Sequence, residues 1–286
     1  MIIFLNLNNL NVFSRTVKAY SENVKKYKFI IGRQDLGLLN KKDMVISSDD
    51  EVVEVLLENG ILNFELLHAS KIDKFIPNEW KNSLYKTVLN LSTQIFAPWF
   101  IHNYMYNDED ILTIEEDIIL RLNDNFINKL DKSSAMFSSL SLGSILYKNI
   151  GESWIRLQNG KPNDWELLKK RKIWGCPKFY TSFDLNEFTK YFDKVFSDLE
   201  LSNYYKDKLI WHHEFIDELI FSYSPINFKP FDKTVAKYSS PGEKGIVKFT
   251  GREFSNCWNN CIIHISGTTY KLIAINRVLS EMNAEV

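Results

Sequence analysis

The feature that most constrains this chain is an apolar, β-branched run over residues 111–120, interrupted by three consecutive acids, Glu115, Glu116 and Asp117. Such a run predicts a strand that is buried on both faces of a sheet. Burying an unpaired carboxylate is costly or shifts its pKa strongly, so three in a row are expected where the strand ends. In open α/β sheets, the carboxyl ends of the strands are where ligands bind.

The spacing of the acids predicts a metal site. In a strand, Glu115 and Asp117 point to the same face, so both carboxylates can reach one hard cation. This is the geometry of an acid-x-acid motif that holds a nucleotide diphosphate through a metal ion.

Composition bounds the class of protein. The chain has 286 residues, a net charge of -1, 45% hydrophobic residues and 14% aromatic residues, which is enough for a sizeable core. It has neither the low hydrophobicity nor the high net charge of a disordered chain. A net charge near zero argues against a nucleic-acid binder that relies on bulk charge. No repeat or linker divides the chain, so we predict a single domain over residues 1–286.

Cysteine usage and hydropathy predict the compartment. The three cysteines, Cys176, Cys257 and Cys261, are too few and odd in number for a disulfide scaffold, and they suit a reducing compartment. No apolar run reaches the ~20 residues that span a bilayer. We therefore expect a cytoplasmic protein without a transmembrane segment, located in the cytosol or at the membrane surface.

The order of expected elements predicts an α/β fold. Strands are expected over Ile2–Leu7 and residues 28–32, with an amphipathic helix over residues 13–27 between them. A helix over residues 50–59 and a long helix over residues 78–106, broken at Pro98, precede the acidic strand. This alternation indicates a Rossmann-like α/β domain with a central mixed, mostly parallel sheet flanked by helices.

A second motif lies near the C-terminus. His264 lies toward the end of a short apolar strand over residues 261–266, Gly267 comes three residues after it, and Lys271 four residues after Gly267. A histidine at such a position is either a core residue bonded to a backbone carbonyl or, together with the acids, a third metal ligand. Gly267 permits close backbone approach, and Lys271 is a compact cation suited to a diphosphate.

Residues 78–120 resemble the glycosyltransferases of the GT-A fold, particularly family 8 and its relatives. That family carries a long helix and then a strand with an Asp-x-Asp motif, whose place Glu115-x-Asp117 takes here. It also carries a late His-x-x-Gly-x-x-Lys segment. His264 and Gly267 match that segment, and Lys271 comes one residue later than the family spacing.

The resemblance extends to a helical segment around Asp217 and Glu218, where the family has an Asp-Gln pair beside the transferred sugar. It implies that these two carboxylates are catalytic, as a base or as a stabiliser of the sugar cation. The residues that the resemblance implies for the remaining roles are Glu115, Asp117 and His264 for the metal, and Asn6, Leu5, Glu116, Gly267 and Lys271 for the nucleotide.

The resemblance also implies an activity. A divalent cation, Mn²⁺ or Mg²⁺, would assist transfer of a hexose from a nucleoside-diphosphate sugar, with a UDP-sugar expected, to a glycan, protein or lipid acceptor. Residues 1–125 would form the nucleotide-binding half and residues 126–286 the acceptor-binding half. The loop over residues 237–251, rich in Ser, Pro and Gly, is expected to be mobile and to close over the donor.

Other interpretations stay open. The same fold without catalysis would serve as a module that binds a sugar or a partner protein, and the same acids would serve a metal-dependent hydrolase. A zinc site at Cys257, Cys261 and His264 lacks an evident fourth ligand. The helical protease motif suggested by residues 212–214 lacks its second histidine, and Gly143-Ser144 follows the acids instead of preceding them as in a nucleotidyltransferase.

Overall fold

The structure is a computed structural model. It describes residues 1–34, 47–81, 92–122, 126, 130, 133–138, 173–198, 226, 228–231, 236–239, 261–265 and 271–284.

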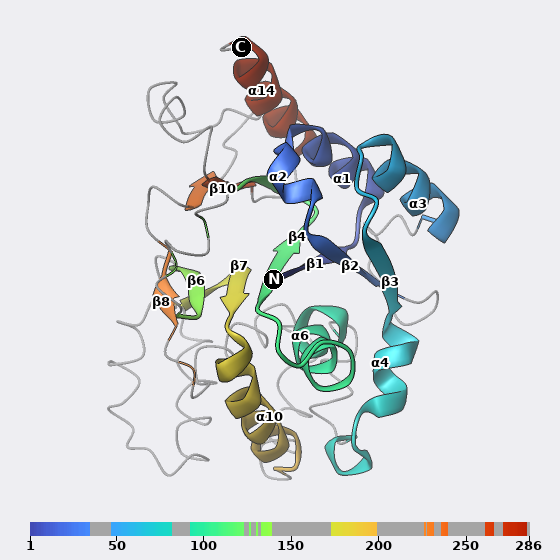
Figure 1. Cartoon of the computed structure of the whole chain (residues 1–286), viewed down its shortest axis with the longest axis vertical. Coiled ribbons are helices and arrows are strands. Elements are labelled where there is room, and N and C mark those ends of the chain that lie inside the picture. Colours follow the sequence, from blue (N-terminus) through green and yellow to red (C-terminus); the bar gives the residue numbers. More distant parts are fainter. Residues whose placement is uncertain are drawn as a thin grey trace, which may run out of the picture.

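A seven-stranded mixed sheet organises the described part of the chain (Figure 1). In sheet order its strands are β3 (Phe64–His68), β2 (Lys28–Arg33), β1 (Ile2–Leu7), β4 (Ile111–Glu115), β7 (Ile173–Tyr180), β6 (Ala135–Ser138) and β8 (Lys229–Pro230). The first four strands run parallel to one another, β7 is antiparallel to both β4 and β6, and β6 is parallel to β8. The predicted α/β class with a mixed, mostly parallel central sheet is confirmed.

Strand β1 shows why helices cover both faces of this sheet. All six of its residues are buried. Side chains alternate between the faces of a strand, so Ile2 and Phe4 enter one core cluster while Ile3 and Leu5 enter another. A strand that is apolar on both faces is stable only between two layers.

Two sets of helices supply those layers (Figure 1). Aromatic residues of the first set fill the core on one face, where Trp80 packs against Trp99 and Phe196. The second set buries Phe13, Val52 and their neighbours on the other face. The first set comprises α4 (Ala69–Phe75), η2 (Asn78–Trp80), α6 (Ser92–Tyr104) and α10 (Ser182–Phe196), and the second comprises α1 (Leu10–Thr16), η1 (Val17–Ala19), α2 (Glu22–Lys25) and α3 (Asp49–Glu58).

A smaller three-stranded sheet continues from the end of β4. Its strand order is β5 (Ile118–Arg121), β10 (Cys261–Ile265) and β9 (Ala236–Ser239). Helix α14 (Lys271–Ala284) buries Ala274, Ile275 and Val278 in a cluster with Ile119 and Ile263 of this sheet. Figure 1 shows α14 beside α1 at the end of the molecule that carries β10.

Several expected elements differ from those observed. The apolar run over residues 111–120 forms two strands in different sheets, because Glu116 and Asp117 occupy a turn between β4 and β5. The helix expected over residues 13–27 is divided into α1, η1 and α2. The break expected at Pro98 is wrong, since α6 continues through Pro98 and most of its surrounding side chains are buried.

The second half of the chain adds one further difference. Residues 237–239 of the expected loop belong to strand β9, paired with β10, and residues 240–251 lie outside the described residues.

Among the helices that the structure describes, none is long and apolar enough to cross a membrane.

Gly32 generates a testable prediction about packing. A methyl group at this position would lie 2.7 Å from Cζ of the fully buried Phe4, so the ring or the backbone would have to shift. We expect Gly32→Ala to lower the free energy of unfolding by ~1–3 kcal/mol through overpacking, measured by urea denaturation. Combined with Phe4→Leu, it should cost less than the sum of the two single changes, because the smaller side chain relieves the clash. Strictly additive costs would contradict this explanation.

Candidate metal and diphosphate site

The three acids lie at the carboxyl end of β4. Glu115 is the last residue of that strand, and Glu116 and Asp117 form the turn that leads into β5. We call residues 115–117 the acid turn. Because β1 and β4 are parallel and Asn6 pairs with Glu115, the end of β1 lies at the same edge of the sheet.

Hydrogen bonds from the segment 16–20 and from β10 hold the backbone carbonyl groups of the acid turn and of Ile118, which follows it. The Thr16 hydroxyl donates to the carbonyl oxygen of Glu116 at 2.7 Å, and the Tyr20 hydroxyl donates to that of Ile118 at 3.2 Å. The Ile265 backbone N–H donates to the carbonyl oxygen of Asp117 at 3.1 Å. Each bond satisfies a polar group close to the core, so the turn has a defined conformation.

Strand register brings His264 to the acid turn. Strand β10 is antiparallel to β5, and His264 pairs with Ile118, the residue that follows Asp117. Its Nε2 lies 3.4 Å from Oδ1 of Asp117. Candidate ligand atoms of Glu115, Asp117 and His264 all lie within 4.8 Å of one another. The structure therefore brings together the three residues that the sequence analysis selected.

Lys271 reaches the same carboxylate from α14. Its Nζ lies 2.6 Å from Oδ2 of Asp117. The Asp117 side chain is only 4% exposed, whereas that of Lys271 is 21% exposed. Asp117 is thus faced by a lysine on one oxygen and a histidine on the other.

These neighbours set the protonation of the cluster. Burial alone would raise the pKa of Asp117, but His264 and Lys271 outweigh burial and lower that pKa to about 2. Burial and then the charge of Asp117 raise the pKa of Glu115. Burial would lower the pKa of His264, but Asp117 outweighs it and raises that pKa. Opposite charge thus keeps Asp117 ionised, and the same residue favours the cationic form of His264.

Glu116 connects the acid turn to the segment after β1. The backbone N–H of Asn8 donates to its Oε2 at 3.2 Å. Asn6 is buried at the end of β1, and Leu5, one residue earlier, packs into the hydrophobic core. Of the two residues of β1 predicted to contact the nucleotide, Asn6 therefore lies at the edge that carries the acids, whereas Leu5 is covered by the core.

Lys178 is a residue near the site that the sequence analysis did not select. It is fully buried on β7 and pairs with Thr113 of β4, two residues before Glu115. Its charge is among the influences that lower the pKa of Glu115. The sequence feature that could have indicated its burial is its position directly before two aromatic residues, Phe179 and Tyr180.

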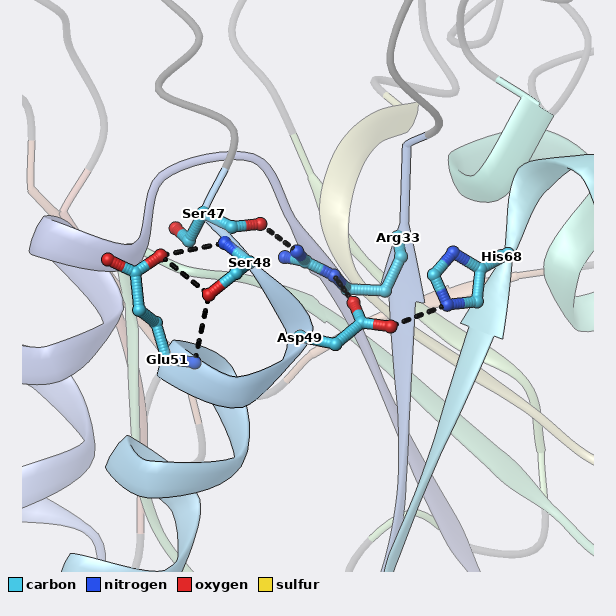
Figure 2. A network of polar contacts seen from close by, with 6 residues as sticks. All are labelled: Arg33, Ser47, Ser48, Asp49, Glu51 and His68. Atoms are coloured by element: carbon cyan, nitrogen blue, oxygen red, sulfur yellow. Dashed lines mark hydrogen bonds and ion pairs between the residues drawn. The ribbon is translucent and has the colours of Figure 1, made fainter.

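A polar network occupies the neighbouring ends of β2 and β3 (Figure 2). Arg33 donates from Nε to Oδ1 of Asp49 at 3.1 Å and from Nη2 to the carbonyl oxygen of Ser47, while His68 Nε2 lies 3.0 Å from Oδ2 of Asp49. A capping box between Ser48 and Glu51 begins α3 beside it. The network fixes the start of α3 against two strands of the sheet edge, and no sequence motif indicated it.

Some predicted residues lie outside the described part of the chain. These are Gly267, the carboxylate pair Asp217 and Glu218, Cys257 of the zinc hypothesis, residues 212–214 and Gly143-Ser144.

Two proteins of known structure are similar to this α/β chain. The crystal structure of mouse xyloside xylosyltransferase 1 in its apo form is 11% identical, covers 92% of this chain and 96% of its own, and has a TM-score of 0.47. The apo structure of the bifunctional glycosyltransferase WbbM is 11% identical and covers 94% of this chain with a TM-score of 0.44, over 46% of its own length. No protein-family model matches the sequence, and no curated protein matches it.

Glu116 generates a prediction about pH. Burial and then the charges of Asp117 and Glu115 raise its pKa to about 8, whereas an unfolded glutamate has a pKa of about 4.3. Between these values the folded state keeps a proton that the unfolded state has lost, so this residue lowers stability as pH rises. We expect Glu116→Gln to be increasingly more stable than the parent protein from about pH 4.5 to about pH 8.

Urea denaturation in chelator-containing buffer across this range measures the effect. Glu187→Gln, at an exposed glutamate paired with Lys190, is the matched control. Parallel stability curves for Glu116→Gln and the parent protein would refute the assignment.

Proposed function

We propose that this chain is a metal-dependent glycosyltransferase that transfers a sugar from a nucleoside-diphosphate sugar to a glycan, protein or lipid acceptor. The observation that carries the proposal is the convergence of two carboxylates, one imidazole and one lysine at the carboxyl edge of an α/β sheet. This combination suits a cation together with the diphosphate that the cation binds.

The donor set fits a divalent cation. Two ligand atoms that bind one ion at ~2.0–2.6 Å lie no more than about 5 Å apart, and the candidate atoms of Glu115, Asp117 and His264 meet that limit at 4.8 Å. Carboxylate oxygens suit both Mg²⁺ and Mn²⁺, and the imidazole nitrogen favours Mn²⁺. When bound, the cation would supply charge that offsets the negative charge growing on the leaving nucleoside diphosphate.

Residues of the chain supply the rest of donor binding in this proposal. Lys271 provides a mobile ammonium for the diphosphate, and Asn6 offers both a donor and an acceptor for the base or ribose of a UDP-sugar. Glu116, which accepts a hydrogen bond from the backbone N–H of Asn8 after β1, is the third residue of the chain assigned to the nucleotide. Gly267 would allow its backbone to approach the phosphates.

The reacting sugar is assigned to a different pair of residues. We propose that Glu218 contacts the transferred sugar, as a base toward the acceptor or as a stabiliser of the sugar cation, and that Asp217 positions it. The pair follows from sequence resemblance and lies outside the described residues.

Ligand binding tests the first half of the proposal. A thermal-shift measurement with UDP and Mn²⁺ should stabilise the protein by ~2.7 kcal/mol at about 100 times the dissociation constant, which corresponds to roughly 5–10 °C. Asp117→Asn should abolish the shift because it removes the central carboxylate, and chelation of Mn²⁺ should do the same. Asp108→Asn is the control, since Asp108 is exposed in the segment that precedes β4.

The products distinguish three activities at one site. Transferred sugar supports the glycosyltransferase, whereas free sugar as the sole product indicates a hydrolase. Tight, Mn²⁺-dependent nucleotide binding without turnover of any sugar nucleotide indicates a binding module. Absence of any Mn²⁺-dependent nucleotide binding would overturn the proposal.

Glu218→Gln tests the catalytic assignment. The change keeps the shape and removes the charge, so turnover should fall by ~10² or more while nucleotide affinity is retained, because the lost interaction belongs to the transition state. Steady-state kinetics and UDP titration measure the two quantities. Asp217→Asn is the comparison and should be the milder change. Undiminished transfer by Glu218→Gln would exclude it as the catalytic residue.

A further inference from the structure

The contact between Lys271 and Asp117 suggests how the site behaves before any ligand arrives. Nζ of Lys271 lies 2.6 Å from Oδ2 of Asp117, and Nε2 of His264 lies 3.4 Å from Oδ1 of the same carboxylate. The ammonium therefore contacts the residue at the centre of the candidate metal ligands.

The acid turn needs a counter-charge. The Asp117 side chain is ionised although it is only 4% exposed, and Glu115 and Glu116 precede it directly in the chain. Buried acids without a partner are strongly unfavourable. Lys271 supplies the positive charge that a divalent cation would otherwise supply.

The placement of Lys271 on α14 allows its ammonium to move. Lys271 is the first residue of that helix, whose body is anchored by Ala274, Ile275 and Val278. A four-carbon side chain can relocate its ammonium while the helix stays fixed. A cation at a helix N-terminus is disfavoured by the helix dipole, so the ion pair with Asp117 offsets a local cost.

We propose that Lys271 is an internal substitute for the divalent cation, and that it must leave Asp117 for the cation to bind tightly. This inference rests on the proposed function of the cluster. The cation and the ammonium are like charges that would sit within roughly 6 Å of each other on one carboxylate, so each weakens the other. A nucleoside diphosphate removes the conflict, because its phosphates accept the released ammonium.

The consequence is cooperative binding. The cation alone binds weakly, and the cation together with the nucleoside diphosphate binds tightly, since Lys271 exchanges a carboxylate partner for a phosphate partner. By thermodynamic linkage, the nucleotide strengthens cation binding by the same factor as the cation strengthens nucleotide binding. Lys271 is then a positioning residue that couples the two ligands.

The test measures Mn²⁺ affinity directly, without turnover. Free Mn²⁺ is titrated by electron paramagnetic resonance against the full chain, first without nucleotide and then with saturating UDP. We expect Lys271→Met to bind Mn²⁺ alone about tenfold or more tightly than the parent, as loss of a nearby like charge allows. The same variant should lose about tenfold or more of the enhancement that UDP produces.

Matched variants control for the charge and for the chemistry of the substitution. Lys271→Arg keeps the positive charge and should retain weak metal-only binding. Lys271→Gln is expected to behave as Lys271→Met does. It takes the place of Lys271→Met if that variant fails to fold. Lys190→Met removes an exposed lysine that pairs with Glu187 on α10, and it should match the parent in both titrations.

The outcomes separate this inference from the proposed function. Unchanged or weaker metal-only binding by Lys271→Met overturns the substitute role, while Mn²⁺ binding by the parent in the presence of UDP keeps the metal site. Absence of Mn²⁺ binding by both proteins, with and without UDP, overturns the metal site and this inference together. Tighter metal-only binding with a reduced UDP enhancement supports both.

Discussion

Three parts of the chain that lie far apart in sequence meet at one buried carboxylate, that of Asp117. Asp117 ends the turn after β4, His264 comes from β10 and Lys271 begins α14. Breaking a buried ion pair by removing one partner is costly because it leaves a charge uncompensated. Electrostatics therefore hold β10 and α14 to the turn that follows β4, and the apolar cluster around Ile119 and Ile263 packs the small sheet, α14 and α1 together.

The apolar framework determines where such a charge can be tolerated. Strands β1 and β4 are buried between two helix layers along their length, so polar side chains are accommodated chiefly at the strand ends. Asn6 and Glu115 stand side by side at that end, and the Arg33–Asp49 network occupies the ends of the next two strands. The parallel arrangement thus collects polar chemistry at one edge, where α/β proteins bind ligands.

The kinds of candidate ligand atom at this edge limit the activities that the site could serve. Two carboxylates and one imidazole could hold a divalent cation, and under the proposed function the lysine on the central carboxylate suits an anionic partner of that cation. Hydrolysis and transfer share these requirements, because both stabilise a leaving diphosphate. What separates them is the group that accepts the sugar, and the proposed pair Asp217 and Glu218 addresses that step.

The sequence by itself determined the α/β class and the edge at which the acids lie. Hydrophobic periodicity and turn residues act over a few positions, so Ile2–Leu7, α3 and β10 were predictable from local pattern. The interruption of an apolar run by acids was also local, and it placed Glu115 and Asp117 at a strand end.

Only the tertiary structure decided which segments meet. The division of residues 111–120 between two sheets, the antiparallel entry of β7 with buried Lys178, and the Arg33–Asp49–His68 network all depend on pairings between distant residues. Local periodicity specifies which side chains want burial but not which partner buries them, since that choice is made by the packing of the whole chain. For the same reason the sequence could select His264 and Lys271 as candidates, while strand register and helix position brought them to opposite oxygens of Asp117.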